Sequence, residues 1–160
     1  MKLGTKGRYA VMAVVDLAKH GSDKPISLSE ISERQEISLS YLEQLFSKLR
    51  KSSIVLSARG AQGGYTLARN ASHITIAEIV SAAEEPLRLT RCSKIIGNGC
   101  MSSNSRCLTH NLWEELGNHI YEFLDSVTLD DVLNKNTGQS MVNLFAKNPE
   151  EYPKKISINE

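Results

Sequence analysis

All three cysteines of the chain lie in one short stretch, Cys92, Cys100 and Cys107, and His110 follows the last of them. Glycine, asparagine and serine fill much of the space between them, and these residue types form turns rather than a core. The cysteines are therefore not expected to be buried core side chains, the usual fate of an unpaired cysteine. An odd number also cannot close a complete set of disulfides. Three thiolates and an imidazole in a polar loop predict a site for a metal ion or an iron–sulfur cluster.

The spacing of these residues bears on which group is bound. Seven residues separate Cys92 from Cys100, and six separate Cys100 from Cys107. Structural zinc sites usually contain closely spaced cysteine pairs, whereas iron–sulfur clusters accept ligands from wider loops. The spacing favours a cluster and leaves zinc open. His110 is the nearest candidate for a fourth ligand, with His119 or a nearby carboxylate as alternatives. If Cys107 and His110 share the first turn of a helix, their separation of three residues puts both on one face.

Several functional classes are not supported by the sequence. We find no persuasive nucleophile arrangement, no second cofactor motif and no signature of a substrate pocket, so the chain is predicted not to be an enzyme. No run of about 18 apolar residues occurs, and the first residues lack an apolar signal core. Neither secretion nor a membrane span is expected, and unpaired cysteines fit a reducing cytoplasm.

Charge divides the 160 residues into two halves. Residues 1–75 contain 11 Lys and Arg against 6 Asp and Glu, whereas residues 76–160 contain 8 against 12. A basic first half of a nearly neutral chain suggests a polyanionic partner, although ordinary surface variation is the alternative.

Two short helices in the basic half predict a helix-turn-helix. A buried helix over residues 7–18 comes first. Ser27 and Glu30 then have the spacing of a capping box that opens a helix over 28–35, and Ser40 with Glu43 has the same spacing before the next helix. Leu39, Leu42, Leu45, Phe46 and Leu49 are expected on the apolar face of that second helix. Its first turn is the part that enters a major groove, so the candidate DNA contacts are Ser38, Ser40, Tyr41 and Gln44. The alternative is a plain helical hairpin.

A basic hairpin after these helices favours DNA binding. Residues 54–58 alternate like a strand, residues 59–64 contain three glycines, and residues 65–67 return. The hairpin is predicted to be the wing of a winged helix, with Arg59 placed to enter a minor groove. No Lys-Ser/Thr pair and no helix follow the glycines, so a nucleotide-binding loop is rejected.

The remainder of the chain is predicted to be helical and then polar. Thr75 and Glu78 form another capping-box pattern. The longest amphipathic segment covers 108–124, with a short helical turn over 128–133. The apolar stripe of the 108–124 segment is expected to pair with a second copy of the chain rather than to fold back as core. The candidate dimer residues are Leu112, Leu116, Ile120, Phe123 and Leu124.

The predicted fold class is mainly α. Residues 1–86 form a winged helix-turn-helix DNA-binding domain, residues 87–110 a cluster-binding loop, residues 108–134 a dimerisation helix with a short following helix, and residues 135–160 a loosely ordered tail.

Motifs along most of the chain resemble the IscR family of bacterial iron–sulfur cluster regulators. The matching stretches are Lys6-Gly-Arg-Tyr-Ala-Val11, Ile31-Ser-Glu-Arg-Gln35, Ile37-Ser-Leu-Ser-Tyr-Leu-Glu-Gln-Leu-Phe46, Arg59-Gly60, Gly63-Gly-Tyr65 and Cys107-Leu-Thr-His110. The resemblance extends to about residue 133. The two cysteine spacings are longer than those usual in this family.

The resemblance implies a homodimeric transcription factor that carries one [2Fe–2S] cluster per subunit and binds double-stranded operator DNA. Cys92, Cys100, Cys107 and His110 would hold the cluster, with the cluster-assembly machinery as its donor. The loaded protein would repress cluster-assembly genes, and the form without a cluster would bind a second operator class. The family's DNA-contacting positions match Ser38, Ser40, Tyr41, Gln44, Arg59 and Gly60, and Glu43 matches the position that makes one operator class depend on the cluster.

Two other functions stay open. One is a sensor of nitric oxide or iron, built on the same scaffold and holding a [4Fe–4S] cluster. The other is a zinc-stabilised helical interaction protein that does not touch DNA.

Overall fold

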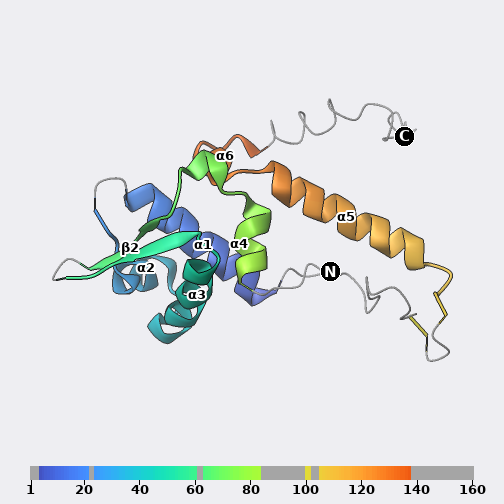
Figure 1. Cartoon of the computed structure of the whole chain (residues 1–160), viewed down its shortest axis with the longest axis horizontal. Helices are drawn as coiled ribbons and strands as arrows, with labels where there is room; N and C mark the ends of the chain where they lie inside the picture. Colours follow the sequence, from blue (N-terminus) through green and yellow to red (C-terminus); the bar gives the residue numbers. More distant parts are fainter. Residues whose placement is uncertain (1–3, 22–23, 61–62, 84–99, 102–104, 138–160) are drawn as a thin grey trace, which may run out of the picture.

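The computed structural model of the chain describes residues 4–21, 24–60, 63–83, 100–101 and 105–137. Helices dominate, and the one hairpin among the described residues joins two antiparallel strands. The elements, in chain order, are α1 (Thr5–His20), α2 (Leu28–Gln35), α3 (Leu39–Lys51), β1 (Val55–Ala58), β2 (Gly64–Leu67), the 3₁₀ helix η1 (Ala71–His73), α4 (Ile76–Ala82), α5 (His110–Ser126) and α6 (Leu129–Leu133). Most of them gather around α1, whereas α5 projects away from this body (Figure 1).

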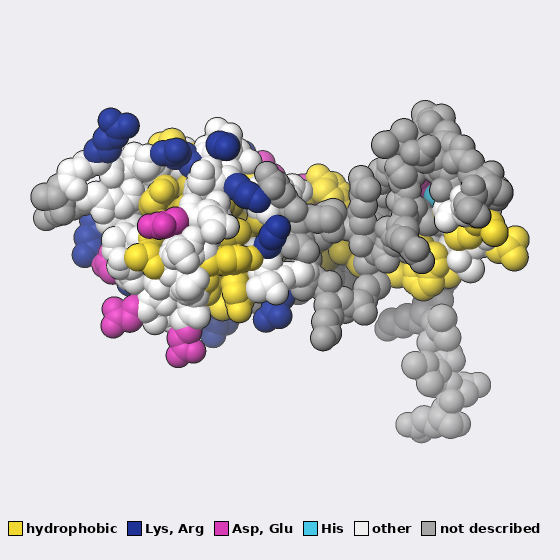
Figure 2. Space-filling model, turned by 90° about the horizontal axis from the view of Figure 1, so that it is seen from below, with side chains coloured by type: hydrophobic (Ala, Val, Ile, Leu, Met, Phe, Trp, Pro, Cys, Tyr) yellow, Lys and Arg dark blue, Asp and Glu magenta, His cyan; other side chains and the backbone are white. Residues whose placement is uncertain are grey.

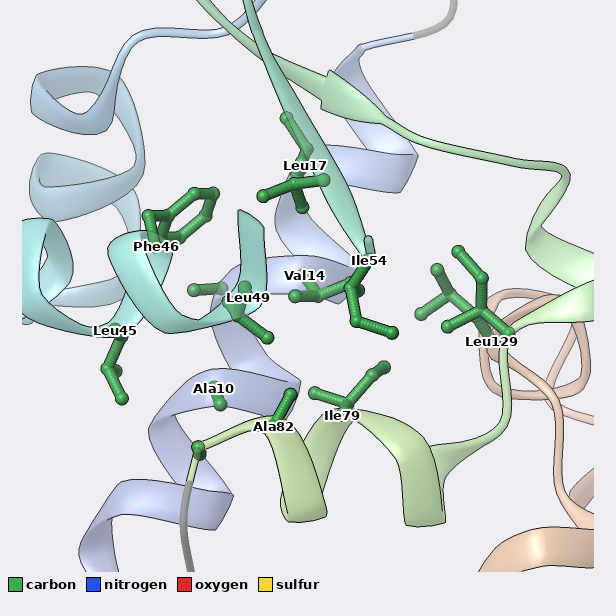
Figure 3. Close-up of a cluster of buried hydrophobic side chains, with 14 of the residues drawn as sticks. Ala10, Val14, Leu17, Leu45, Phe46, Leu49, Ile54, Ile79, Ala82 and Leu129 are labelled. Atoms are coloured by element: carbon green, nitrogen blue, oxygen red, sulfur yellow. The ribbon is translucent and has the colours of Figure 1, made fainter. Parts of the chain in front are cut away.

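Helix α1 is the centre of the core. It contacts α2, α3, α4, α6 and β2, and Ala10, Ala13, Val14 and Leu17 on it are almost completely buried. Figure 3 shows side chains of α3, α4 and α6 converging on it. The predicted buried helix is therefore confirmed, and it extends two residues further at each end than the apolar pattern indicated.

The helix-turn-helix forms as predicted around a tight connection. The Ser27 hydroxyl accepts a hydrogen bond from the Glu30 amide at 3.3 Å, and the Glu30 carboxylate accepts one from the Ser27 amide at 2.9 Å, which confirms the capping box. Helix α2 ends at Gln35, and the next residue, Glu36, caps it with a left-handed backbone at φ 54°. The Ser32 hydroxyl then donates to the carbonyl of the buried Ile37 at 2.6 Å. This local bond helps to fix the turn that leads into α3.

Two expectations for α3 were wrong. The capping box at Ser40 and Glu43 does not form, because the amides of Tyr41 and Leu42 already donate to the Ser38 carbonyl and the helix begins at Leu39. Leu39 was placed with the apolar face, yet it is 40% exposed, whereas Leu42, Leu45, Phe46 and Leu49 are buried as expected. At 100° per residue, Leu39 lies at the edge of that face rather than at its buried centre.

The predicted wing is present. Val55 pairs with Leu67 and Ala58 with Gly64 in the antiparallel ladder. The sequence did not indicate that Ile26 extends it: its amide donates to the Tyr65 carbonyl at 2.9 Å and its carbonyl accepts from the Tyr65 amide at 2.8 Å. A Cβ on Gly64 would lie 2.5 Å from the Ile26 carbonyl oxygen, so only glycine permits this close approach.

Backbone hydrogen bonds attach the end of α5 to the winged-helix body. The Ile76 amide donates to the Val127 carbonyl at 2.9 Å, and the Leu129 amide donates to the Ile74 carbonyl at 2.8 Å. Thr75 forms the predicted capping box with Glu78, and Thr128 forms one with Asp131 at the start of α6. The two ends of α5 therefore have different surroundings, since its carboxyl end joins the core and its amino end does not. None of the helices in the described ranges has both the length and the apolar character that a membrane span requires.

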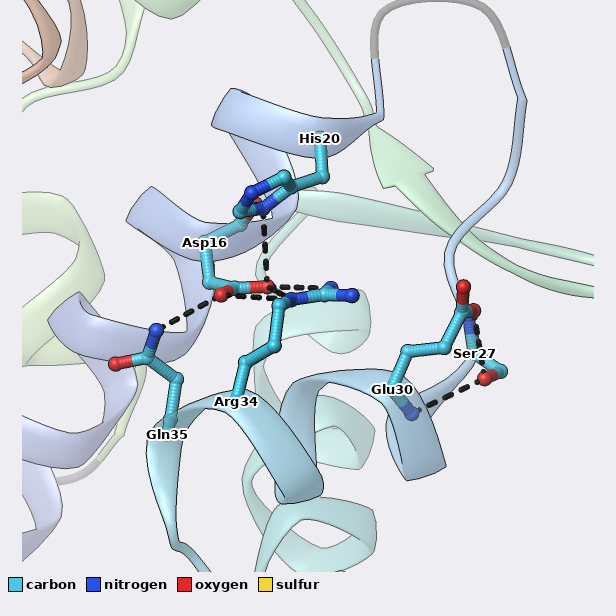
Figure 4. Close-up of polar contacts among 6 residues, drawn as sticks. All are labelled: Asp16, His20, Ser27, Glu30, Arg34 and Gln35. Carbon is cyan, nitrogen blue, oxygen red and sulfur yellow. Dashed lines mark hydrogen bonds and ion pairs between the residues drawn. The ribbon is translucent and has the colours of Figure 1, made fainter.

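A buried carboxylate joins α1 to α2. Asp16 is 2% exposed. Arg34 donates to it from Nε at 3.0 and 3.1 Å and from Nη2 at 2.7 Å, and Gln35 donates from Nε2 at 2.8 Å (Figure 4). Burial by itself would raise the pKa of Asp16, but the hydrogen bonds from Arg34 and Gln35, together with the charges of Arg34 and His20, outweigh it and lower that pKa below its ordinary value. The ionised carboxylate therefore stabilises the native fold.

We predict that Asp16→Asn lowers the free energy of unfolding at pH 7 by about 1–3 kcal/mol, the range for hydrogen bonds to a charged group. Because the folded pKa is lowered, this contribution is fully present above the unfolded pKa of about 4 and is lost as the pH falls through the folded pKa. Urea unfolding of wild type and variant between pH 7 and pH 2.5 should show the difference shrinking. Glu33→Gln, at an exposed position beside Arg34, is the control and should change little. A difference that is the same at both pH values would contradict the assigned role of the Asp16 charge.

Candidate metal centre and nucleic-acid interface

Cys100 and His110 lie together in the structure. The Cys100 Sγ is 3.0 Å from the His110 Nδ1. His110 is the first residue of α5 and is 4% exposed, and it is the one buried residue of that helix. Two of the four predicted cluster ligands are thus in direct contact.

The other ring nitrogen of His110 has an unusual environment. Its Nε2 is buried and has no hydrogen-bond partner among the residues that the structure describes. The Glu114 Oε2, one helical turn further on, is 3.5 Å away. This separation allows an ion pair but is too long for a good hydrogen bond. The Nδ1 of His110 thus faces a thiol, and its Nε2 faces a carboxylate. Many metal-ligating histidines have this arrangement, with a carboxylate on the side of the ring away from the metal. Sequence reasoning missed Glu114 as the partner, although its separation of four residues from His110 on a helix could have indicated it.

Cys107 does not share the first helical turn with His110, so the condition under which both would lie on one helical face is not met. The cap of α5 is Thr109, and Cys107 precedes it outside the helix. The two residues remain close through the backbone, since the His110 amide donates to the Cys107 carbonyl at 3.1 Å. The Cys107 Sγ is 3.7 Å from the Thr109 hydroxyl, which in turn accepts a hydrogen bond from the Trp113 indole at 3.1 Å.

The remaining ligand candidates are placed less favourably or are not described. Cys92 falls outside the described residues, as does most of the predicted 87–110 loop. Within the described ranges, no group of three or more His, Cys, Asp or Glu side chains is arranged to hold a metal ion. His119 is 41% exposed and lies near Glu115 and Glu122 on its own helix, at 3.9 and 3.5 Å.

The predicted DNA contacts on α3 form an exposed polar surface. Ser38, Ser40, Glu43 and Gln44 are exposed. Tyr41 is partly buried, and its ring packs edge-on against Tyr9 of α1 with centroids 5.8 Å apart. The surface is therefore held by the core beneath it rather than by contacts among its own side chains.

The wing and the last turn of α3 carry further positive charge. Arg59 follows β1 and is exposed, and Gly60 has φ 124°, a left-handed conformation that favours glycine. Lys48, Arg50 and Lys51 occupy the last turn of α3. Figure 2 shows Lys and Arg side chains spread over the winged-helix body, with apolar side chains visible both on that body and on the projecting part.

The candidate dimer residues divide between the two ends of α5. Phe123 and Leu124 pack against the core, and Leu116 and Ile120 are partly buried. Leu112 is 58% exposed, and exposed Trp113 and Tyr121 lie on the same helix. The carboxyl end of the apolar stripe therefore folds back on the core, whereas side chains nearer its amino end stay exposed. Pairing of the stripe with a second copy of the chain stays a prediction.

A helix-turn-helix with a polar exposed first turn on its second helix, followed by a two-stranded wing, defines a winged-helix DNA-binding regulator. Comparison with known families agrees: residues 3–135 match the Rrf2 family, described as iron-dependent transcriptional regulators. The chain belongs to the Rrf2 family of transcriptional regulators.

Individual relatives confirm the likeness to IscR. The chain is 49% identical over 134 residues to the transcriptional regulator IscR of Pectobacterium atrosepticum, and 50% identical over 134 residues to IscR of Yersinia pseudotuberculosis. Each alignment covers 84% of this chain and 80% of the relative.

Solved structures agree with the sequence comparison. IscR of T. potens superposes with a TM-score of 0.68 at 40% identity, covering 85% of this chain and 88% of that one. CymR, the global cysteine regulator of B. subtilis, gives 0.69 at 33% identity, covering 84% and 98%. The predicted winged-helix fold is thereby confirmed, and these relatives are regulators rather than enzymes.

Proposed function

We propose that this chain senses iron–sulfur cluster status through a bound [2Fe–2S] cluster and controls the genes of cluster assembly. The observation that carries this proposal is the 3.0 Å contact between the Cys100 thiol and the ring of the buried His110. The likeness to proteins named IscR supports it.

The proposed ligands are Cys92, Cys100, Cys107 and His110. Their chemistry fits the group, since thiolates hold iron–sulfur clusters and an imidazole replaces a thiolate in some of them. The unsatisfied, buried Nε2 beside Glu114 is consistent with a histidine oriented for ligation through its other nitrogen. A bound cluster would supply a reversible and removable prosthetic group, and His110 would make the site less negative than a site with four cysteines.

The proposed DNA-reading surface consists of the first turns of α3 and the tip of the wing. Ser38, Ser40, Tyr41 and Gln44 would contact bases and phosphates of a major groove, with Arg59 and Gly60 at the adjacent minor groove. Glu43 would repel the DNA unless the cluster-bound form repositions its carboxylate, which gives a physical basis for operators that depend on the cluster.

The proposed working form is a homodimer that binds two operator half-sites in the cytoplasm, with the cluster-assembly machinery as cluster donor. The exposed apolar side chains at the amino end of α5 are the proposed contact between subunits. They would bring two winged helices into one assembly, as a pseudo-palindromic operator requires.

We predict different DNA-binding defects for Arg59→Ala and Gln44→Ala. Arg59→Ala should weaken binding to all sequences and reduce the slope of log affinity against log salt by about 1, because one phosphate-neutralising charge is lost. Gln44→Ala should cost about 1–3 kcal/mol at particular base pairs and leave the slope unchanged. Fluorescence anisotropy across a salt series with point-substituted operators measures both. Unaltered affinity in both variants would show that the reading surface lies elsewhere, and affinity of the wild type that is indifferent to salt would favour the interaction-protein alternative.

We predict that protein purified without oxygen contains about two irons and two sulfides per chain. His110→Ala should alter the visible spectrum, because one ligand is replaced. Iron, sulfide and zinc analysis of wild type and variant provides the measurement. Four irons per chain, or a spectrum indifferent to His110→Ala, would favour the nitric-oxide or iron sensor, an alternative motivated by the long cysteine spacings. Zinc without sulfide would exclude the cluster.

We predict that Glu114→Gln speeds cluster loss to a chelator by about tenfold, the lower end of outer-shell effects, because the Nε2 of His110 loses the carboxylate that faces it. Glu115→Gln is the matched control. The Glu115 carboxylate is one residue away, 73% exposed, and faces His119 instead. Equal rates of cluster loss in both variants, followed by visible absorbance, would contradict a positioning role for Glu114.

A further inference from the structure

An apolar side chain lies in the middle of the proposed DNA-reading surface. Leu39 is 40% exposed in the first turn of α3, between the exposed residues Ser38 and Ser40. Within the described part of the chain, it is not among the side chains that form or pack against the hydrophobic core. Glu43 follows one helical turn later and is also exposed.

Folding does not explain a leucine at this position. The four apolar residues further along α3, Leu42, Leu45, Phe46 and Leu49, are at most 3% exposed and provide the packing of this helix. A single exposed leucine is ordinary on a protein surface. The position of Leu39 is what gives it meaning, because the first turn of a recognition helix is the part that meets base edges.

The major groove offers one apolar group to such a side chain. Thymine carries a 5-methyl group there, whereas the other bases present hydrogen-bond donors and acceptors at their edges. Leucine cannot form hydrogen bonds through its side chain, so it does not discriminate among those polar edges by bonding. Contact between the leucine and a buried methyl group strengthens binding, whereas a leucine that covers a polar atom without a hydrogen-bond partner weakens it.

We propose that Leu39 is a specificity-determining residue that selects thymine, by contact with its 5-methyl group, at one position of each operator half-site. This inference rests on the proposed function, since it requires that α3 reads the major groove. The neighbouring Ser38 and Ser40 would supply polar contacts to the flanking groups, and Leu39 would supply the apolar contact between them.

The wing provides a matched control. Leu56 on β1 is 53% exposed, and is therefore also a solvent-exposed leucine on the proposed DNA-binding part of the protein. The wing is expected at a minor groove, however, and thymine methyl groups lie in the major groove. Leu56→Ala is therefore expected to leave any dependence on thymine methyl groups intact.

The test removes the methyl group from the DNA and the side chain from the protein. An operator is first selected from random duplexes with the full-length wild-type protein. Each thymine is then replaced in turn by uracil, which removes only the 5-methyl group. The Kd of each duplex is measured for wild type, Leu39→Ala, Leu39→Met and Leu56→Ala, with circular dichroism and urea unfolding to establish that each variant is folded.

We expect one thymine per half-site at which uracil weakens wild-type binding by about fourfold, the effect of losing one buried methyl group. The same replacement should leave Leu39→Ala unchanged, because the two changes remove the two sides of one contact. Leu39→Met and Leu56→Ala should retain the loss.

Two results would overturn the inference, and they differ in what else they affect. In the first, the wild type binds DNA in a salt-dependent way, and uracil replacement weakens Leu39→Ala at the same positions and by the same factors as the wild type. This result would reject Leu39 as the residue that selects thymine and would leave the proposed function intact. Failure of the wild type to select any duplex would reject both.

Discussion

The buried carboxylate of Asp16 is the constraint on which the geometry of the helix-turn-helix depends. An ionised carboxylate inside a protein is costly unless it is paired and hydrogen-bonded, and the donors come from the end of α2. Helix α2 therefore cannot shift along α1 without uncovering that charge. The short turn through Glu36 and Ile37 then leaves little freedom to α3, whose apolar side packs on the same core.

A second constraint ties the carboxyl end of α5 to this body. The paired strand-like segments before α4 and after α5 exchange backbone hydrogen bonds, so the end of the projecting helix is part of the winged-helix unit. Its amino end, with His110 beside Cys100, lies away from that unit (Figure 1). One continuous helix thus connects the proposed cluster site to the part of the protein that resembles DNA-binding domains.

The sequence was most informative where the determining pattern is local. The capping boxes at Ser27 and Thr75 and the glycine-containing wing follow from residues a few positions apart, and all three form. The hydrogen bonds of Asp16 link it to two residues that are 18 and 19 positions away along the chain. The periodicity of apolar residues does not predict such partners. The cap of α3 was assigned to Ser40 because two nearby serines are both possible helix caps. Leu39 was assigned to the buried face because helical spacing defines a face but does not show which part of it other elements cover. Cys100 and His110, both candidates named from the sequence, lie in contact. Cys92 lies outside the described residues, so the ligand set stays a prediction.

The attachment of α5 at one end has a mechanical consequence. Its 17 residues correspond to a rod of about 25 Å at the rise of an α-helix, anchored near Val127 and carrying His110 at its tip. On that length, a tilt of about 5° moves the tip by roughly 2 Å, comparable to the margin that separates a bonded from a broken contact between His110 and Cys100. A small change in the angle of α5 at its anchored end therefore produces a larger displacement of His110. Conversely, holding His110 in place restricts the angle of the whole helix.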